Sequence, residues 1–204
     1  MDQVVRLESF ELQVSRMTAL KFAASLSLLA VSIVGCGNEP AKSENDAKTT
    51  AAATPSGGKS GTVATDFTTR DLEGKTVRLG EYLGKKAILL DFWTTFCDPC
   101  LHELPHLRKL YEANKDKGFV VVAVSMDGPD TVGQVPDFAK RNRMTFPVWL
   151  DEDSHVSNIY NPKKSAPLSV LINREGKVVR IHEGFNAGDE EVLAKEVEAI
   201  LSQK

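Results

Sequence analysis

The 204-residue sequence lacks several features that would place it in a broad class at once. It has no excess of positive charge, because 25 Lys and Arg residues stand against 28 Asp and Glu residues and the net charge is −3. Nucleic acid is therefore not expected as a partner. It has no uninterrupted apolar run of about 20 residues, which a membrane-spanning helix needs. It has only three cysteines, an odd number that cannot all pair within the chain. The hydrophobic content of 42% is enough for one core of ordinary size.

The longest apolar run, residues 22–35, follows Arg16 and Lys21 and has the length and flanks of a signal-peptide core. It ends in Ile33-Val34-Gly35-Cys36, which resembles the lipobox of bacterial lipoproteins. We therefore expect residues 1–36 to be a signal peptide ending in a cysteine that is lipidated and anchors the protein outside the cytoplasm, in the periplasm. An ordinary signal peptide or a buried helix is the alternative. Acidic residues before the apolar run make Met17 a second candidate start beside Met1.

Residues 37–62 contain no aromatic residue and no Leu, Ile, Val or Met. Such a segment cannot bury enough apolar surface to offset the entropy lost on ordering. We expect a flexible linker over 37–62 and a folded domain over 63–204.

The chain is organised around residues 87–105. Ala87 to Trp93 reads as a buried strand, and the turn that follows carries Cys97 and Cys100 at the start of a predicted helix. A helix N-terminus carries unpaired N–H groups and a partial positive charge, which stabilise a thiolate. Pro99 is suited to the first helical turn. The spacing allows the two sulfurs to form a disulfide.

The remaining pattern alternates strands and helices. It predicts an opening hairpin at 66–69 and 76–79, a helical turn near 80–86 and a helix to about Asn114. Strands are expected at 119–125, 146–150, 168–173 and 177–182, and helices at 132–142, 154–160 and 189–201. This order indicates an α/β fold with a mixed sheet.

Three separated features resemble the thioredoxin superfamily, and within it the TlpA/ResA-like membrane-tethered thiol–disulfide oxidoreductases. They are Phe92-Trp93 ahead of the cysteines, the Cys97-Asp98-Pro99-Cys100 motif with Glu103 and Pro105, and Ala166-Pro167 before a strand. The resemblance covers residues 64–204. It implies a thioredoxin-like fold, with a central mixed sheet flanked by helices and an N-terminal hairpin extension.

The resemblance also implies roles for particular residues. Pro167 is expected to be cis and to face the cysteine pair, and Trp93, Phe96 and Ala166 are expected to join it in binding substrate. The partners implied are disulfide-containing client proteins, with apocytochrome c as one possibility, and a membrane thiol-electron transporter. We expect a monomer without a cofactor or metal.

Disulfide exchange needs an attacking thiolate, a resolving thiol and a base. Cys97, nearer the helix end, is the expected nucleophile and Cys100 the resolving thiol. Asp91 and Glu103 are both candidate proton acceptors, because burial raises the pKa of a carboxyl group towards the working range. The alternatives are a structural role for Asp91 and a surface position for Glu103. Asp98 adds negative charge beside Cys97, which favours a reductant over a strong oxidant.

Other functions are weighed against this one. Residues 102–106 match the His-Glu-x-x-His zinc-protease pattern, but Pro105 lies inside it. A zinc site of Cys97, Cys100, His102 and His106 has unusually tight spacing. A thiol peroxidase of peroxiredoxin-like type needs a Thr and a Pro ahead of the reactive cysteine, an arrangement that Thr94-Thr95-Phe96 lacks. The non-enzyme alternative is a tethered binding module with a structural disulfide, although so short a loop gains little stability from its bridge.

Overall fold

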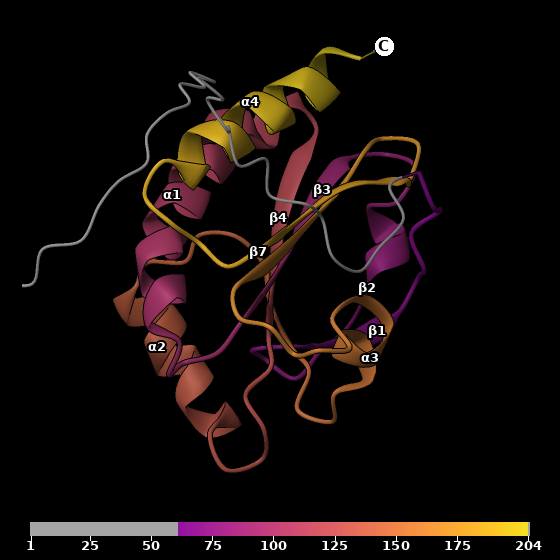
Figure 1. The fold of residues 1–204 in the computed structure, drawn as a ribbon. Helices are drawn as coiled ribbons and strands as arrows, with labels where there is room; N and C mark the ends of the chain where they lie inside the picture. The colour runs from indigo at the N-terminus through magenta and orange to yellow at the C-terminus, as the bar shows by residue number, and fades with distance from the viewer. Residues whose placement is uncertain (1–60, 204) are drawn as a thin grey trace, which may run out of the picture. The chain divides into compact units, whose positions relative to one another are not determined.

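The computed structural model describes residues 61–203, and they form a mixed seven-stranded sheet with helices on both faces (Figure 1). The strands lie in the order β2-β1-β5-β4-β3-β6-β7. Their bounds are β1 Thr68–Asp71, β2 Thr76–Arg78, β3 Ala87–Trp93, β4 Phe119–Ser125, β5 Val148–Leu150, β6 Leu168–Ile172 and β7 Val178–Glu183. The sheet is therefore the α/β architecture that the sequence predicts.

The two central strands are β3 and β4, which pair in parallel from Ala87↔Phe119 to Trp93↔Ser125. Every residue of both strands is buried. The largely apolar sequences of both strands, interrupted within β3 only by Asp91, are typical of strands covered on both faces. β6 pairs antiparallel with β3 on its other side, so the sheet is mixed.

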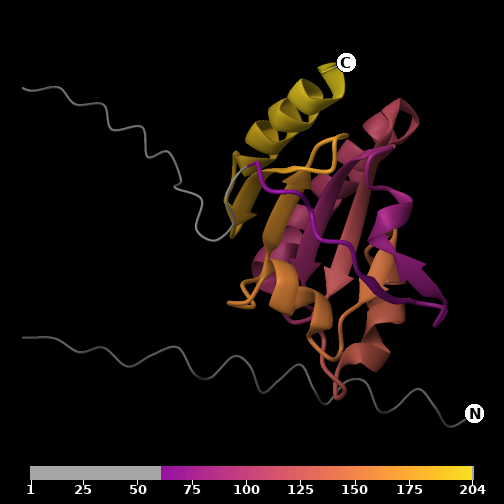
Figure 2. The same ribbon diagram turned by 90° about the vertical axis from the view of Figure 1, so that its right-hand side faces the viewer.

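The helices are α1 Asp98–Asn114, α2 Val135–Arg141, α3 His155–Tyr160 and α4 Asp189–Ser202. α1, α2 and α4 share one apolar cluster with Leu89 and Trp93 of β3, whereas Val156 of α3 shares the other with Leu90 and Phe92. In Figure 2, α3 lies in front of the sheet and α1 behind it. Since successive residues of a strand point to opposite faces, Asp91 faces α1. The fold thus places Asp91 under the helix that carries the cysteines.

Most predicted elements are confirmed, with ends shifted by one or two residues. The opening hairpin is β1 and β2, and β1 also pairs antiparallel with β5, which joins the hairpin to the main sheet. The predicted helix over 132–142 divides into a 3₁₀ turn at Val132–Gln134 followed by α2. The predicted turn before β3 is a 3₁₀ turn at Leu79–Glu81.

The signal peptide, nearly all of the linker and Cys36 lie outside the described residues. Gly61 and Thr62, at the end of the expected linker, pair with the backbone of Val178. None of the helices between residues 61 and 203 has the length and apolarity that a membrane crossing demands.

Candidate active site

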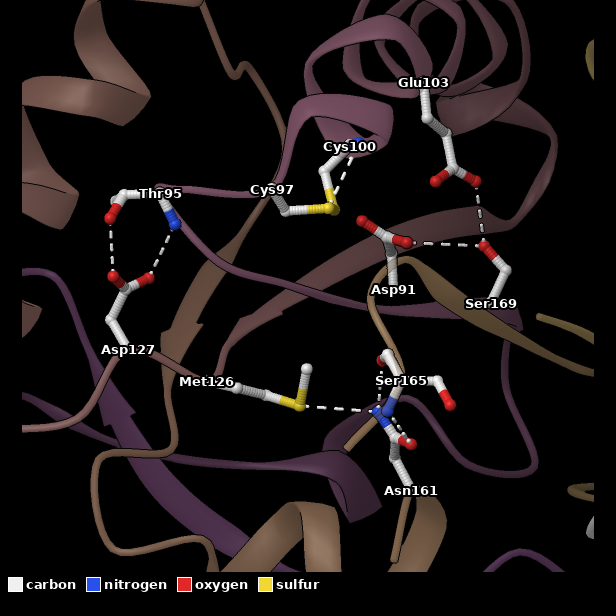
Figure 3. The surroundings of a disulfide bond; sticks show 10 residues. All are labelled: Asp91, Thr95, Cys97, Cys100, Glu103, Met126, Asp127, Asn161, Ser165 and Ser169. Atoms are coloured by element: carbon white, nitrogen blue, oxygen red, sulfur yellow. Dashed lines mark hydrogen bonds between the residues drawn. A yellow bond between two sulfur atoms is a disulfide. The ribbon is translucent and has the colours of Figure 1, made fainter. Parts of the chain in front are cut away.

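Cys97 and Cys100 lie at the N-terminus of α1 and form a disulfide, with an S–S distance of 2.08 Å (Figure 3). Cys97 is the N-cap residue, and its sulfur accepts a hydrogen bond from the Cys100 backbone N–H at 3.2 Å. Pro99 lies in the first turn, as the sequence predicts. A backbone N–H in the first turn of α1, that of Cys100, therefore points at the sulfur of Cys97, and a helix N-terminus is an environment that favours a thiolate after reduction.

The two cysteines differ in access to solvent. Cys97 is 8% exposed and Cys100 is 1% exposed, so the expected nucleophile is the more accessible of the two. Cys97 borders a groove of about 440 Å³, and the Phe96 side chain beside it is 71% exposed. The groove is lined by Thr94, Phe96, Cys97, Asp98, Pro99, Met126, Lys164 and Ala166.

The turn before Cys97 is fixed by Asp127, a fully buried carboxylate that follows β4. Asp127 Oδ2 accepts a hydrogen bond from the Thr95 backbone N–H at 2.9 Å, and Oδ1 accepts one from the Thr95 hydroxyl at 2.5 Å. The Ser125 hydroxyl also donates to Asp127 at 2.9 Å. A residue in the loop after the neighbouring strand β4 thus holds the backbone two residues before Cys97.

The loop that follows α3 supplies the other wall of the groove. The Ala166–Pro167 peptide bond is cis, as predicted. Asn161, which is 1% exposed, donates from its side chain to the Ser165 carbonyl at 2.7 Å and accepts from the Ser165 N–H at 3.0 Å. Pro167 accepts a hydrogen bond from the Gly184 N–H at 2.8 Å. The position of Ala166 beside the cysteines is therefore determined by hydrogen bonds on both sides of it.

Asp91 and Glu103 are both buried below the cysteine pair, with exposures of 1% and 4%. The alternative of a surface position for Glu103 is therefore wrong. Burial raises the pKa of Asp91 to about 7. Burial, and secondarily the negative charge of Asp91, raises the pKa of Glu103 to about 9. In Figure 3 the carboxyl group of Asp91 lies between the cysteines and Ser169. Near pH 7 Asp91 is thus the group closer to accepting a proton, whereas Glu103 can accept one only after it has lost its own.

Trp93 was expected to bind substrate, but it does not lie on the surface of the domain. Its side chain is fully buried and packs against Phe138, with ring centroids 5.0 Å apart. Successive residues of β3 face opposite sides of the sheet, and Trp93 points to the side covered by α1, where it is part of the core. Phe96 and Ala166, by contrast, line the groove.

Sequence reasoning missed three polar residues that position the site, namely Ser169, Asp127 and Asn161. The Ser169 hydroxyl lies 3.4 Å from Asp91 Oδ1 and 3.2 Å from Glu103 Oε1. One signal for it was present, because Ser169 is the single polar residue in the buried strand β6. A polar residue inside such a strand requires a partner. No comparable signal marks Asp127 or Asn161, which lie in loops.

The positions of the side chains also test the two zinc sites considered from the sequence. No group of three or more His, Cys, Asp or Glu side chains in the described part of the chain is arranged to hold a metal ion. α1 continues through Pro105, but Glu103 turns towards Ser169 and His106 packs on Phe185, with centroids 5.7 Å apart. Neither zinc arrangement considered from the sequence is assembled here.

A cysteine pair at a helix N-terminus, beside a cis-proline loop on a mixed sheet, defines a class of protein: the thioredoxin-like thiol–disulfide oxidoreductases. The comparison with known families then places the chain more closely. A family model described as the AhpC/TSA family matches residues 60–181, and the chain belongs to this family.

Relatives within this class carry the activity in their names. The chain is 36% identical over 126 residues to the thiol-disulfide oxidoreductase ResA of Halalkalibacterium halodurans, covering 62% of this chain and 69% of that protein. It is 35% identical over 137 residues to ResA of Bacillus thuringiensis, covering 66% of this chain and 77% of the relative. The resemblance to TlpA/ResA-like oxidoreductases expected from the sequence is therefore confirmed, and this protein is a thiol–disulfide oxidoreductase.

Solved structures agree with this placement. A crystal structure of a putative thiol:disulfide interchange protein DsbE from Chlorobium tepidum superposes with a TM-score of 0.65 at 33% identity. That superposition covers 70% of this chain and 98% of the other. The thioredoxin-like fold with a mixed sheet is thereby established for the domain.

Proposed function

We propose that this protein is tethered to a membrane outside the cytoplasm and reduces disulfides in client proteins through the Cys97–Cys100 dithiol. One observation carries the proposal: the sulfur of Cys97 caps α1 and borders a groove, while Cys100 is buried behind it. This arrangement favours an exchange between an accessible thiolate and a second thiol that resolves the product.

In the first step, the thiolate of Cys97 attacks one sulfur of the client disulfide. A bond forms between Cys97 and that sulfur, the client S–S bond breaks, and the other client sulfur leaves as a thiolate. The N–H groups of the first turn of α1 lower the cost of the negative charge on Cys97 before the attack.

In the second step, Cys100 loses its proton and its thiolate attacks Cys97. The Cys97–Cys100 bond re-forms and the second client thiolate leaves, so the client gains two electrons and the dithiol is oxidised. Asp91 and Glu103 are the proposed proton acceptors, since both are buried carboxyl groups with raised pKa values beneath the cysteine pair.

The groove is the proposed client-binding surface. Phe96 offers an exposed ring next to Cys97, and Met126 and Ala166 extend the apolar lining. An extended peptide can pair with backbone groups near Ala166 and Pro167 while its disulfide meets Cys97. The family resemblance suggests apocytochrome c as one client and a membrane thiol-electron transporter as the source of electrons.

The proposed location rests on the N-terminal sequence. The apolar run at 22–35 and its terminal Cys36 support a lipoprotein signal, with the acylated cysteine as the anchor. The polar segment at 37–62 then serves as a linker between the membrane and the domain. We expect radiolabelled palmitate to be incorporated into the wild type but not into Cys36→Ala.

A trapping experiment tests the proposed reaction. Cys100→Ser removes the resolving thiol, so we expect it to accumulate a mixed disulfide with the client at Cys97, which reductant reverses. Cys97→Ser is the matched control and is expected to trap nothing. A failure of reduced wild-type protein to reduce insulin disulfides contradicts the proposal, as does peroxide consumption that exceeds disulfide reduction.

A further inference from the structure

The Ser169 hydroxyl lies between two buried carboxyl groups. It is 3.4 Å from Asp91 Oδ1 and 3.2 Å from Glu103 Oε1, and Ser169 itself is 2% exposed (Figure 3). A hydroxyl group has one proton to donate and lone pairs to accept with. Ser169 can therefore donate to one carboxylate only, and its bond to the other requires that this carboxyl group be protonated and donate to the serine oxygen.

The charge in this space leads to the same conclusion. Two ionised carboxylates on either side of one hydroxyl would repel each other in a buried region that holds no cation among the described side chains. Burial raises the pKa of both groups. Asp91 and Glu103 therefore hold at least one proton between them at neutral pH.

One end of this unit borders a cavity. Glu103 lines a cavity of about 510 Å³ between α1 and α4, together with His106, Phe185 and Glu190. The second carboxyl oxygen of Glu103, Oε2, is buried and has no hydrogen-bond partner within the described part of the chain. The other end, Asp91, lies beneath the cysteines. The unit thus connects the cysteine pair to a different face of the molecule from the client groove.

We propose that Ser169 is a positioning residue that joins Asp91 and Glu103 into a proton relay running from Cys100 to the cavity between α1 and α4. This inference rests on the proposed function and adds the route by which the resolving thiol loses its proton. Ser169 does not touch the cysteines or the client, and it acts only through the two carboxyl groups.

Each proton that moves through the relay has a donor and an acceptor. At rest, Ser169 donates to ionised Asp91 and accepts from protonated Glu103. Asp91 takes the proton of the Cys100 thiol, and Glu103 releases its own proton to solvent in the cavity. Asp91 then passes a proton to the Ser169 oxygen while the Ser169 hydroxyl proton moves to Glu103, which restores the starting state. One proton has moved from Cys100 to the cavity, and no group outside the relay has changed.

Several other titratable groups face this unit, and they set the background of any pH profile. Asp189 at the start of α4 adds negative charge that raises the pKa of Glu103. On β7, His182 is the register partner of Ser169, and its ring contacts Glu196 of α4 at 2.7 Å. Cys97 and Cys100 lie on the other side of Asp91. The charged and titratable residues that line the cavity beside Glu103 are His106, Lys109, Lys117, Glu190, Glu191 and Glu198.

The test separates the two steps of exchange with an aromatic disulfide whose released thiolate is coloured. Reduced protein mixed with excess probe releases one thiolate when Cys97 attacks and a second when Cys100 resolves the adduct. The second release does not depend on probe concentration, so its rate and pH profile report the relay. The variants are Ser169→Ala, Ser169→Thr, which keeps the hydroxyl, and Ser157→Ala. Ser157 is a matched control because it is also a buried serine that donates to a carboxylate, Asp151, on the opposite side of the sheet.

We expect Ser169→Ala to release the first thiolate at the wild-type rate and the second about tenfold more slowly at pH 7. Loss of a hydrogen bond to a charged carboxylate disfavours ionised Asp91, which moves the midpoint of the profile up by about one pH unit. Ser169→Thr is expected to restore the wild-type midpoint, and Ser157→Ala to leave it unchanged. A second release in Ser169→Ala with the wild-type rate and midpoint overturns the relay and leaves the proposed function standing. If the wild type releases no thiolate, the proposed function and the relay fail together.

A measurement on the unmutated protein keeps the inference testable if Ser169→Ala does not fold. The oxidised wild type at pH 8 is expected to show the infrared carbonyl band of one protonated carboxyl group, which Glu103→Gln abolishes. A spectrum with no such band, or with two, contradicts the shared proton.

Discussion

Asp91 and Ser169 are direct partners in the antiparallel pairing of β3 with β6, although 78 positions separate them in the sequence. Residues paired in this way point to the same face of a sheet, so the register alone brings the two side chains together. That face is the one covered by α1, which adds Glu103 from above. Several consequences of this and the neighbouring contacts can be measured.

The first prediction concerns stability and pH. The pKa of Asp91 is raised to about 7 in the fold and is about 4 in an unfolded chain. The folded protein therefore holds a proton that the unfolded chain has released, and the free energy of unfolding falls as pH rises from about 4 to about 7. Asp91→Asn removes this loss. We expect it to raise the free energy of unfolding by about 2 to 4 kcal/mol at pH 8 and by little near pH 4, as measured by urea unfolding of the oxidised protein.

Asp151→Asn is the control for that measurement. Asp151 is also a buried carboxylate, but it accepts hydrogen bonds from the Val156 and Ser157 N–H groups and from the Ser157 hydroxyl. Its replacement is expected to destabilise the fold at pH 8, because those bonds weaken. Stabilisation by both variants, or by neither, contradicts the assignment of the effect to Asp91.

The second prediction concerns the turn before Cys97. Asp127→Ala leaves the Thr95 N–H, the Thr95 hydroxyl and the Ser125 hydroxyl without their acceptor. We expect the free energy of unfolding to fall by about 2 to 4 kcal/mol, and the reaction of Cys97 with a small disulfide to slow because the turn is less well fixed. Asp127→Asn keeps one acceptor oxygen, so its stability and its reaction rate are expected to lie between those of the wild type and Asp127→Ala. An unchanged rate in a folded Asp127→Ala protein contradicts the positioning role.

The third prediction separates client binding from chemistry. Phe96 is 71% exposed, so Phe96→Ser is expected to change the free energy of unfolding by no more than about 0.5 kcal/mol. If a client covers the ring, losing about 1 kcal/mol of contact slows the reduction of a protein disulfide about fivefold. The rate with a small disulfide probe is expected to stay the same. Leu101→Ser is the control, since Leu101 is also partly exposed on α1 but does not line the groove. Equal slowing by both variants contradicts a specific role for Phe96.

The fourth prediction concerns the reduction potential. Asp98 follows Cys97 directly, is exposed, and places negative charge in the first turn of α1. We expect a wild-type potential nearer the thioredoxin value, about −270 mV, than that of a strong oxidant, about −120 mV. Asp98→Asn removes charge repulsion of about 1 kcal/mol on the thiolate, so the pKa of Cys97 is expected to fall and the potential to rise by about 20 mV. Equilibration with glutathione buffers measures the potentials of the wild type and the variant. A lower potential in the variant contradicts this prediction.

Local patterns predicted the elements of this fold well. The buried runs at 87–93 and 119–125 are strands with those same bounds, and the helix after the cysteines ends at Asn114 as expected. The cis bond at Pro167 followed from family resemblance and is confirmed. Boundaries shifted most where the signal was short, as in the hairpin and in the 3₁₀ turn ahead of α2. Such segments depend on what they pack against.

Only part of the active site could be predicted from the sequence. Cys97 and Cys100 are close in sequence, and their positions in one helical turn bring the sulfurs together without help from distant residues. Trp93 could not be assigned correctly from its position beside the turn, because the side of β3 that each residue faces depends on the layers above and below the sheet.

The sequence by itself determined the cysteine turn, the helix that it caps and the order of strands and helices, because these depend on neighbours within a few residues. Only the tertiary structure decided which polar side chains meet beneath the cysteines. Ser169 lies 78 positions from Asp91 and 66 from Glu103, and their meeting depends on the register of β6 against β3 and on the packing of α1 across both strands. Strand register is set by burial over the whole sheet, so no local pattern specifies it.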